Sequence, residues 1–164
     1  MGWVSIESKP IPTPPTLPLK GREQCLSCEL CEGLGGHLLW QDQSCRVVRV
    51  DDADYPGFCR VIWNRHVKEM TDLTEAERQH FMNVVFAVEQ AVRQTFNPDK
   101  INLASLGNMT PHLHWHVIPR FAADRHFPNP IWGAAMREGQ PVFSLDWQQR
   151  LQAALQQSLQ PERN

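Results

Sequence analysis

The sequence predicts an α+β fold with a mainly antiparallel sheet. Three observations lead to this prediction. Short segments rich in β-branched and aromatic residues come first, a long amphipathic helical segment follows, and a pair of strand-like segments then precedes a last helix. Strands that occur in groups, rather than in regular alternation with helices, are typical of this fold class.

Length and composition limit what the chain can be. Its 164 residues indicate one domain, since two domains would each lie near the lower size limit. Hydrophobic residues make up 41% and charged residues 21%, which argues against wholesale disorder. The formal net charge of -2 argues against a typical nucleic-acid binder. Neither a membrane-spanning run nor a signal peptide is apparent, so we expect a soluble cytoplasmic protein with no nucleic-acid or membrane partner.

The N-terminal segment is rich in proline and cannot form a helix or an interior strand. We therefore divide the chain into a proline-rich arm over residues 1–22 and a folded domain over residues 23–160. The prolines of the arm are Pro10, Pro12, Pro14, Pro15 and Pro18.

The first strands are expected in the segments that follow a glycine-rich turn. Residues 37–40 and 45–50 are the first two candidates, and residues 58–63 form the third. The acidic, proline- and glycine-containing stretch at 51–57 has the composition of a turn.

A long helix is expected next. Thr74 followed by Glu77 is a capping-box pattern, and Pro98 ends the segment. Between them, apolar residues recur at helical spacing over about six turns of 3.6 residues each. These residues are Phe81, Val84, Val85, Val88, Ala91, Val92 and Phe96.

Two more strands and a helix complete the prediction. The strands are expected over residues 100–106 and 112–120. The last helix is indicated by an apolar stripe of Trp147, Leu151, Ala154, Leu155 and Leu159.

The segment most informative about chemistry reads P-H-L-H-W-H-V-I-P-R, from Pro111 to Arg120. Because the side-chain period of a strand is two, His112, His114 and His116 would share one face while the apolar residues between them pack into the core. This arrangement suits either a metal site or nucleophilic catalysis by a neutral imidazole.

The neighbouring residues favour a phosphate ligand over a hydrolytic metal. Residues 101–123 contain no Asp or Glu, whereas neutral hydrogen-bonding groups are frequent. An imidazole with an ordinary pKa of about 6.5 is largely neutral at pH 7 and can attack phosphorus without a separate strong base. The neutral groups are Asn102, Ser105, Gly107, Asn108 and Thr110.

The histidine pattern, read as H-φ-H-φ-H-φ-φ, resembles the signature of the histidine triad (HIT) family of nucleotide hydrolases and transferases. The likeness extends from about Cys28 to Arg120, and residues 106–121 with 129–132 resemble a bacterial branch described as diadenosine tetraphosphate hydrolase-like. The resemblance implies a five-stranded antiparallel sheet, one long helix and a C-terminal helix. It also implies a homodimer and attack on a nucleotide α-phosphorus.

The resemblance also assigns roles to the histidines. His114 would be the nucleophile that forms a nucleotidyl-imidazole intermediate, and water would then hydrolyse it. His116 would donate a hydrogen bond to the α-phosphate and assist the leaving group, while His112 would orient the other two. No cofactor is needed for this chemistry.

Substrate contacts are expected from a separate set of residues. Asn102 resembles the family's substrate-contacting asparagine and Gly107 its phosphate-loop glycine. Where the family often has Gln followed by Ser or Thr, this chain has Asn108 and Met109, so Thr110 is the candidate for the missing hydroxyl. Asp51 could bind the ribose hydroxyls or be a solvated turn residue.

The cysteines suggest a structural metal. Five cysteines, an odd number, without an export signal argue against a disulfide framework. In zinc-bearing relatives the ligands occur in the order seen here for Cys28, Cys31, His66 and His112, and a structural zinc would fix the ring of His112. Cys25 could replace either cysteine, and the alternative is a set of reduced, metal-free thiols.

The sequence therefore predicts a hydrolase of dinucleoside polyphosphates or nucleoside phosphoramidates. Three alternatives stay open: a nucleotidyl transferase, a nucleotide-binding regulatory module with little turnover, and a histidine-ligated metallohydrolase.

Overall fold

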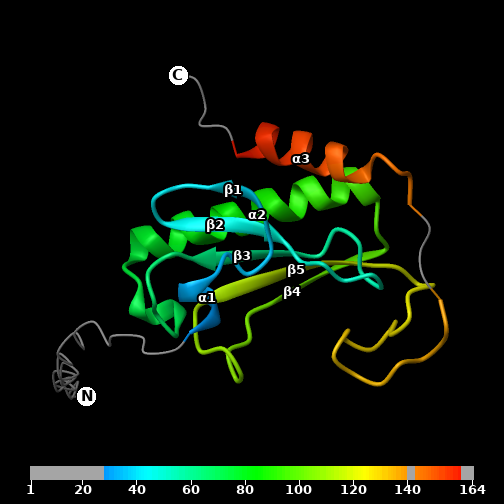
Figure 1. The fold of residues 1–164 in the computed structure, drawn as a ribbon, viewed down its shortest axis with the longest axis horizontal. Coiled ribbons are helices and arrows are strands. Elements are labelled where there is room, and N and C mark those ends of the chain that lie inside the picture. Colours follow the sequence, from blue (N-terminus) through cyan, green and yellow to red (C-terminus); the bar gives the residue numbers. More distant parts are fainter. Residues whose placement is uncertain (1–27, 140–142, 160–164) are drawn as a thin grey trace, which may run out of the picture.

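The computed structural model of the chain describes residues 28–139 and 143–159. The proposed proline-rich arm (1–22), Cys25 and the proposed domain ends at residues 23 and 160 lie outside the described residues. Figure 1 shows a five-stranded sheet with two longer helices packed beside it. The elements are α1 (Glu29–Glu32), β1 (His37–Gln41), β2 (Cys45–Arg49), β3 (Cys59–Trp63), a 3₁₀ turn η1 (Met70–Asp72), α2 (Glu75–Phe96), β4 (Lys100–Ala104), β5 (His114–Arg120) and α3 (Trp147–Ser158).

The sheet is antiparallel throughout, with strand order β1-β2-β3-β5-β4. This confirms the predicted α+β class and the five-stranded sheet. β5 lies between β3 and β4, so residues near its middle have neighbours on both sides. In the described part of the chain, no helix is both long and apolar enough to cross a membrane.

Helix α2 forms as its sequence predicts. The Thr74 hydroxyl accepts a hydrogen bond from the Glu77 backbone N–H at 3.3 Å, and a Glu77 carboxylate oxygen accepts one from the Thr74 N–H at 2.7 Å. The helix ends at Asn97, whose φ of 46° is left-handed, just before Pro98. All seven apolar residues predicted for its inner face are buried.

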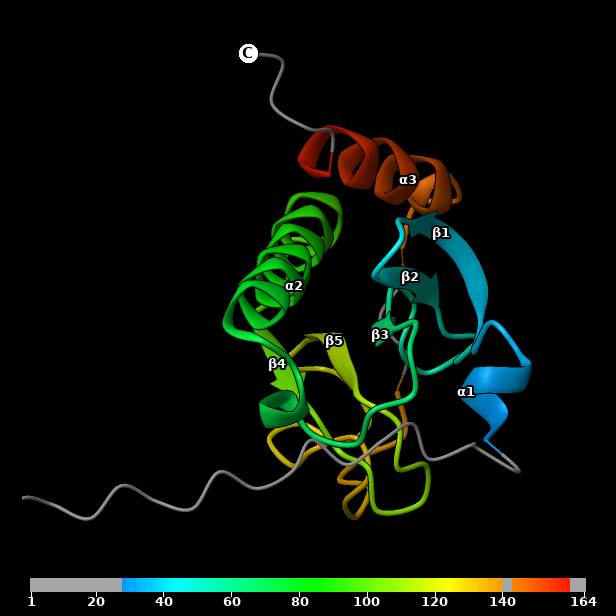
Figure 2. The ribbon, with the colours of Figure 1, turned by 90° about the vertical axis from the view of Figure 1, so that its left-hand side faces the viewer.

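The two faces of the sheet are covered by different elements. Helix α2 packs against β3 and β5, and α3 packs against α2 and β1. Figure 2 shows α1 on the opposite side of the sheet from α2. There Leu30 of α1 joins Cys28, Val48 and Ile62 in a smaller apolar cluster. This second face carries the histidines of β5.

The strand predicted over residues 112–120 begins two residues later than expected. The His112 N–H donates to the Thr110 carbonyl at 2.8 Å, and the Leu113 N–H donates to the Val67 carbonyl at 2.7 Å. These two backbone donors are therefore used in a loop and not in the ladder. As a consequence, only His114 and His116 lie within β5, and His112 precedes it.

Candidate active site

Strand alternation places His114 and His116 on one face of β5. His114 lies opposite Ile62 of β3, while His116 lies between Arg60 of β3 and Ala104 of β4. Directly opposed residues in an antiparallel pair project from the same face. Trp115, on the other face, packs against the main core beneath α2, as its position in the sequence predicted.

The two imidazoles of β5 face each other directly. Their Nε2 atoms are 3.1 Å apart, and the Nδ1 atom of His114 is 2.6 Å from the backbone carbonyl of His112. Because a carbonyl only accepts, the proton of neutral His114 lies on Nδ1. Its Nε2 therefore keeps a lone pair, toward which His116 can donate from its own Nε2.

Burial keeps these rings neutral. Burial lowers the pKa of His114, and the positive charge of Arg60 lowers it further. Burial, then the charges of His114 and Arg60, lower the pKa of His116 to about 3. A neutral imidazole with a free nitrogen is the form that acts as a nucleophile.

The histidine face of β5 is not open to solvent. Only 6% of His114 and 4% of His116 are exposed. Two aromatic rings cover His116, since Phe58 lies 5.5 Å and Trp132 5.1 Å from it between ring centroids. Trp132 comes from the loop after β5 and is itself 52% exposed, so it stands between the imidazole and solvent.

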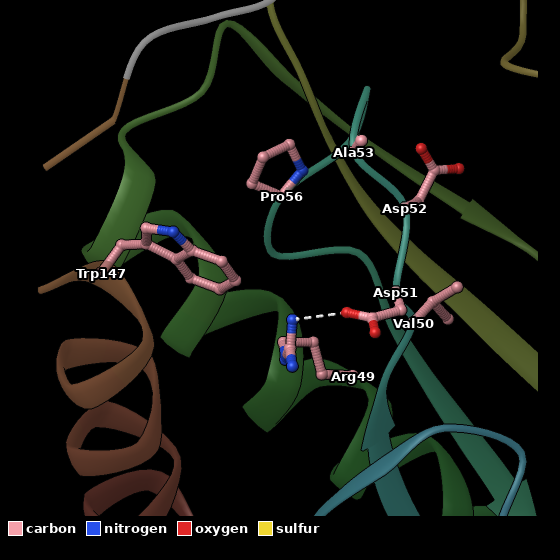
Figure 3. A pocket seen from close by; sticks show the side chains of 7 residues that line it. All are labelled: Arg49, Val50, Asp51, Asp52, Ala53, Pro56 and Trp147. Carbon is pink, nitrogen blue, oxygen red and sulfur yellow. Dashed lines mark hydrogen bonds and ion pairs between the residues drawn. The ribbon is translucent and has the colours of Figure 1, made fainter. Parts of the chain in front are cut away.

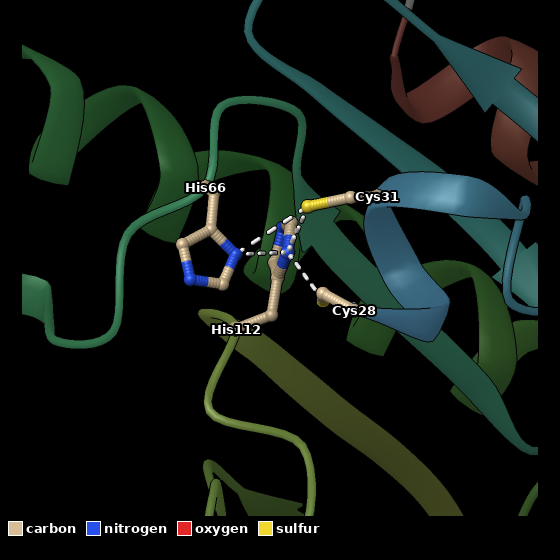
Figure 4. Close-up of side chains that lie close together, drawn as sticks. All are labelled: Cys28, Cys31, His66 and His112. Atoms are coloured by element: carbon tan, nitrogen blue, oxygen red, sulfur yellow. Dashed lines mark hydrogen bonds between the residues drawn. The ribbon is translucent and has the colours of Figure 1, made fainter. Parts of the chain in front are cut away.

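The ring of His112 belongs to a second cluster, shown in Figure 4. Its Nε2 donates to the Trp63 carbonyl at 2.6 Å, which leaves Nδ1 with a lone pair. That Nδ1 faces the sulfur atoms of Cys28 and Cys31 and the Nδ1 of His66. His112 thus contacts His114 through its backbone carbonyl, and not through its imidazole as the orienting role would suggest.

The four side chains of this cluster fit a tetrahedral zinc ion. Bond lengths of about 2.3 Å to sulfur and about 2.1 Å to nitrogen require ligand separations of about 3.4 Å between nitrogens and about 3.6 Å between nitrogen and sulfur. The two Nδ1 atoms are 3.3 Å apart. The sulfur–nitrogen separations are 3.4 Å for Cys28 with His112, 3.4 Å for Cys31 with His66 and 3.5 Å for Cys31 with His112.

A second group of candidate ligands, Asp42, Cys45 and His80, fits a metal poorly. One carboxylate oxygen of Asp42 accepts the backbone N–H groups of Ser44 and Cys45, and the other contacts His80 at 2.7 Å. Burial, aided by the nearby Asp42 charge, raises the pKa of the Cys45 thiol far above its ordinary value. This group instead ties the β1–β2 turn to α2.

The structure does not gather all the predicted substrate residues. Asn102 lies on the histidine face, but its Oδ1 accepts a hydrogen bond from Arg120 at 2.5 Å. Gly107 and Asn108 lie in the loop between β4 and β5, and Asn108 is exposed. The Thr110 hydroxyl donates to Glu29 of α1 at 2.8 Å.

Asp51 lies elsewhere. Its side chain is 75% exposed and pairs with Arg49 at 3.1 Å and His37 at 3.4 Å. Figure 3 shows it in a pocket of about 350 Å³ that Trp147 of α3 also lines. This placement does not bring Asp51 to the imidazoles of β5.

Sequence reasoning missed two groups beside the histidines, Arg60 and Phe58. Arg60 lies on β3 and Phe58 directly precedes that strand, and only the folded sheet defines the register of β3 against β5. Trp132 is positioned by a loop in which the carboxylate of Asp124 accepts hydrogen bonds from Arg120 and from backbone N–H groups. The alternation in residues 58–63 was the one available signal for Arg60.

The pairing of two buried imidazoles on a central strand agrees with the comparison to protein families. The HIT domain family matches residues 35–123. The chain belongs to the HIT family. In this HIT domain the matched segment includes all five strands and α2.

Several proteins are similar to this HIT domain. The AP-4-A phosphorylase of Mycobacterium tuberculosis is 26% identical over an alignment of 103 residues, and the match covers 56% of this chain and 53% of that protein. The bis(5'-nucleosyl)-tetraphosphatase [asymmetrical] of Schizosaccharomyces pombe is 34% identical over an alignment of 74 residues, and the match covers 42% of this chain and 41% of that protein. The chain thus spans about half, or less, of the length of these curated relatives.

Solved structures show the same fold. A histidine triad protein from Bradyrhizobium japonicum superimposes with a TM-score of 0.63 at 26% identity, covering 77% of this chain and 92% of that one. One from Marinobacter aquaeolei VT8 gives a TM-score of 0.62 at 27% identity, covering 80% and 93%. These matches confirm the predicted HIT-like fold.

Proposed function

We propose that this chain hydrolyses dinucleoside polyphosphates or nucleoside phosphoramidates at the α-phosphorus, through a covalent intermediate on His114. One observation carries the proposal: the Nδ1 of His114 is bound to a carbonyl, so its Nε2 has a free lone pair beside the Nε2 of His116. The names of the relatives, a tetraphosphatase and a phosphorylase, support the substrate class.

The reaction follows from this pairing in two steps. The lone pair on Nε2 of His114 forms a bond to the α-phosphorus while the bond from phosphorus to the leaving group breaks, and the leaving group keeps those electrons. His116 donates its Nε2 hydrogen bond to an oxygen of the transferring phosphate. Water then attacks phosphorus, loses a proton and displaces the imidazole, which releases a nucleoside monophosphate and restores His114.

Zinc would act in structure and not in these steps. Cys28, Cys31, His66 and His112 would hold it, and it would link the segment before β1 to the loop after β3. By fixing His112, whose carbonyl accepts from Nδ1 of His114, the ion would maintain the tautomer that the nucleophile needs.

A nucleotidyl transferase is the second candidate, because one relative is named a phosphorylase. In that reaction inorganic phosphate replaces water in the second step. Incubation of diadenosine tetraphosphate with and without phosphate separates the two candidates: water yields AMP from the intermediate, whereas phosphate yields ADP.

The test of the mechanism is His114→Ala. Because covalent catalysis is lost, turnover should fall at least ~10³-fold, equivalent to ~4 kcal/mol in the activation barrier. His80→Gln, which changes a histidine on α2, should retain wild-type activity. Wild-type protein quenched during turnover should carry an acid-labile nucleotide on His114.

Other outcomes would favour the other functions. Wild-type activity in His114→Ala, or an adduct on another residue, would contradict the proposal. Activity that is lost to chelators, restored by metal and never accompanied by an adduct would indicate a metallohydrolase. Tight nucleotide binding without turnover would indicate a regulatory module.

We also propose that the chain forms a homodimer. Two strands of the sheet, β1 and β4, lie at its edges and can pair with a second copy. Sedimentation equilibrium should give twice the chain mass, and a monomer at micromolar concentration would contradict this proposal.

A further inference from the structure

One cation beside the histidines has few partners of its own. Arg60 is half-buried, and its Nε atom is fully buried without a hydrogen-bond partner among the described residues. Its one hydrogen bond in the described part of the chain runs from Nη1 to the Gly35 carbonyl and is 3.4 Å long. A guanidinium has five N–H donors, so most of its binding capacity is unused.

Other buried arginines of the domain are used differently. Arg46 donates to the carbonyls of Leu30, Leu34 and Gly33 and to the side chain of Asn64. Arg120 donates to Asp124, Asn102 and the Asn129 carbonyl. Each of these two side chains is a structural crosslink with its donors satisfied, whereas Arg60 is not.

No carboxylate within residues 28–139 and 143–159 lies at ion-pair distance from Arg60. Burial lowers the pKa of Arg60, and the charge of Glu29, which acts from a distance, partly opposes that lowering. The carboxylate of Glu29 accepts the Thr110 hydroxyl instead. A partly buried cation is costly unless an anion compensates it, so an anionic ligand would compensate the charge of Arg60.

The position of Arg60 indicates which part of a ligand it would meet. Arg60 lies directly opposite His116 across the β3–β5 ladder. Both side chains flank the Phe58 ring, with the guanidinium carbon 5.9 Å and the His116 ring 5.5 Å from its centroid. The family resemblance assigns His116 to the leaving group as well as to the α-phosphate, so Arg60 would lie on the leaving-group side of His114.

We propose that Arg60 binds the phosphate chain of the leaving group and selects anhydride substrates over phosphoramidates. This inference rests on the proposed function. When the bond between the α-phosphorus and the bridging oxygen breaks, a nucleoside polyphosphate departs as an anion that keeps the electron pair. A guanidinium can hold two of its oxygens at once. The nitrogen of a phosphoramidate takes up a proton from water as its bond to phosphorus breaks and leaves as a neutral amine, which gains no stabilisation from a cation.

The experiment compares two substrates in matched variants. Arg60→Gln should lower kcat/KM for diadenosine tetraphosphate ~30- to 100-fold and kcat/KM for adenosine 5'-phosphoramidate less than ~3-fold. For diadenosine tetraphosphate, the kcat/KM of Arg60→Lys should lie between the values of the wild type and Arg60→Gln. Arg65→Gln, which removes an exposed cation paired with Glu77, should leave both values unchanged. Equal losses on both substrates, with a lower thermal midpoint, would show that Arg60 is merely structural and would overturn the inference.

A binding measurement separates this inference from the proposed function. In a His114→Ala background, which cannot form the intermediate, calorimetry should show that Arg60→Gln weakens ATP at least ~10-fold and AMP less than ~3-fold. Even if the wild-type protein turns over neither substrate, the inference still requires that Arg60→Gln weakens ATP binding more than AMP binding. Equal effects on ATP and AMP would overturn the role of Arg60, whereas turnover that persists in His114→Ala would overturn only the proposed mechanism.

Discussion

Replacing Asp124 by asparagine should destabilise the fold by about 3–5 kcal/mol. Asp124 is 0% exposed and Arg120 is 2% exposed. One Asp124 oxygen accepts Nε of Arg120 at 2.8 Å, and the other accepts Nη2 at 3.1 Å. Removing one partner of a buried ion pair costs about this amount, because the remaining charge stays buried without compensation.

Backbone N–H groups that donate to Asp124 add to the expected loss of unfolding free energy. The same carboxylate accepts the N–H groups of Phe121, His126 and Phe127 at 3.1, 3.0 and 2.7 Å. An asparagine amide nitrogen would face donors in place of an acceptor oxygen. Burial alone would raise the pKa of Asp124, but these bonds and Arg120 lower it from 3.8 to about 2. That difference corresponds to about 2 kcal/mol of stabilisation from the charge.

Urea unfolding followed by tryptophan fluorescence measures the effect. Because the pKa of Asp124 is depressed in the folded state, its stabilisation is present above pH 3.8 and is lost as the pH falls toward 2. The difference in unfolding free energy between wild type and Asp124→Asn should therefore be largest at pH 7 and decrease below pH 4. Asp51→Asn, which changes a 75% exposed carboxylate, should cost less than about 1 kcal/mol. A loss below 1 kcal/mol for Asp124→Asn at pH 7 would refute this reasoning.

Three further predictions concern the metal cluster, the pH dependence and the aromatic cover. Purified protein should contain about one equivalent of zinc, and Cys28→Ser should lower both the zinc content and the thermal midpoint. Brief chelation should leave turnover intact. Wild-type protein that is free of metal and equally stable would contradict the zinc site. Because burial first, and then nearby charges, lower the pKa of His116 from 6.5 to about 3, the unfolded state binds the proton more readily. The protonation of His116 in the unfolded state should thus lower the free energy of unfolding by about 2 kcal/mol between pH 7 and pH 5. Chemical unfolding of His116→Gln should lack this contribution to the pH dependence. Trp132→Ala should lower kcat/KM about 10-fold with little change in thermal midpoint, and unchanged kinetics would show that the ring only covers His116.

Several elements could be predicted from the sequence because their signals are local. The capping box at Thr74 and the apolar spacing behind it define α2, and the turn composition of residues 51–57 separates β2 from β3. The alternation of residues 114–117 places His114 and His116 on one face and Trp115 on the other. Periodicity and capping depend only on residues that are close along the chain, so the sequence alone predicts them.

The tertiary structure decided the environment of each histidine. His112 leaves the ladder because its backbone bonds to the Thr110 carbonyl, and its ring therefore meets Cys28, which is 84 residues away in sequence. His116 is covered by the ring of Trp132, which the loop after β5 brings over the strand.

The chain by itself determined that two imidazoles share a strand face, since the period of a strand is two. It did not determine that Arg60 stands opposite His116, because the β3–β5 register depends on how separate segments pack. The positive charge of Arg60 and the aromatic rings that shield the histidines from solvent come from side chains that the folded sheet brings together. Such contacts are set by the packing of the whole fold, and no local pattern in the sequence specifies them.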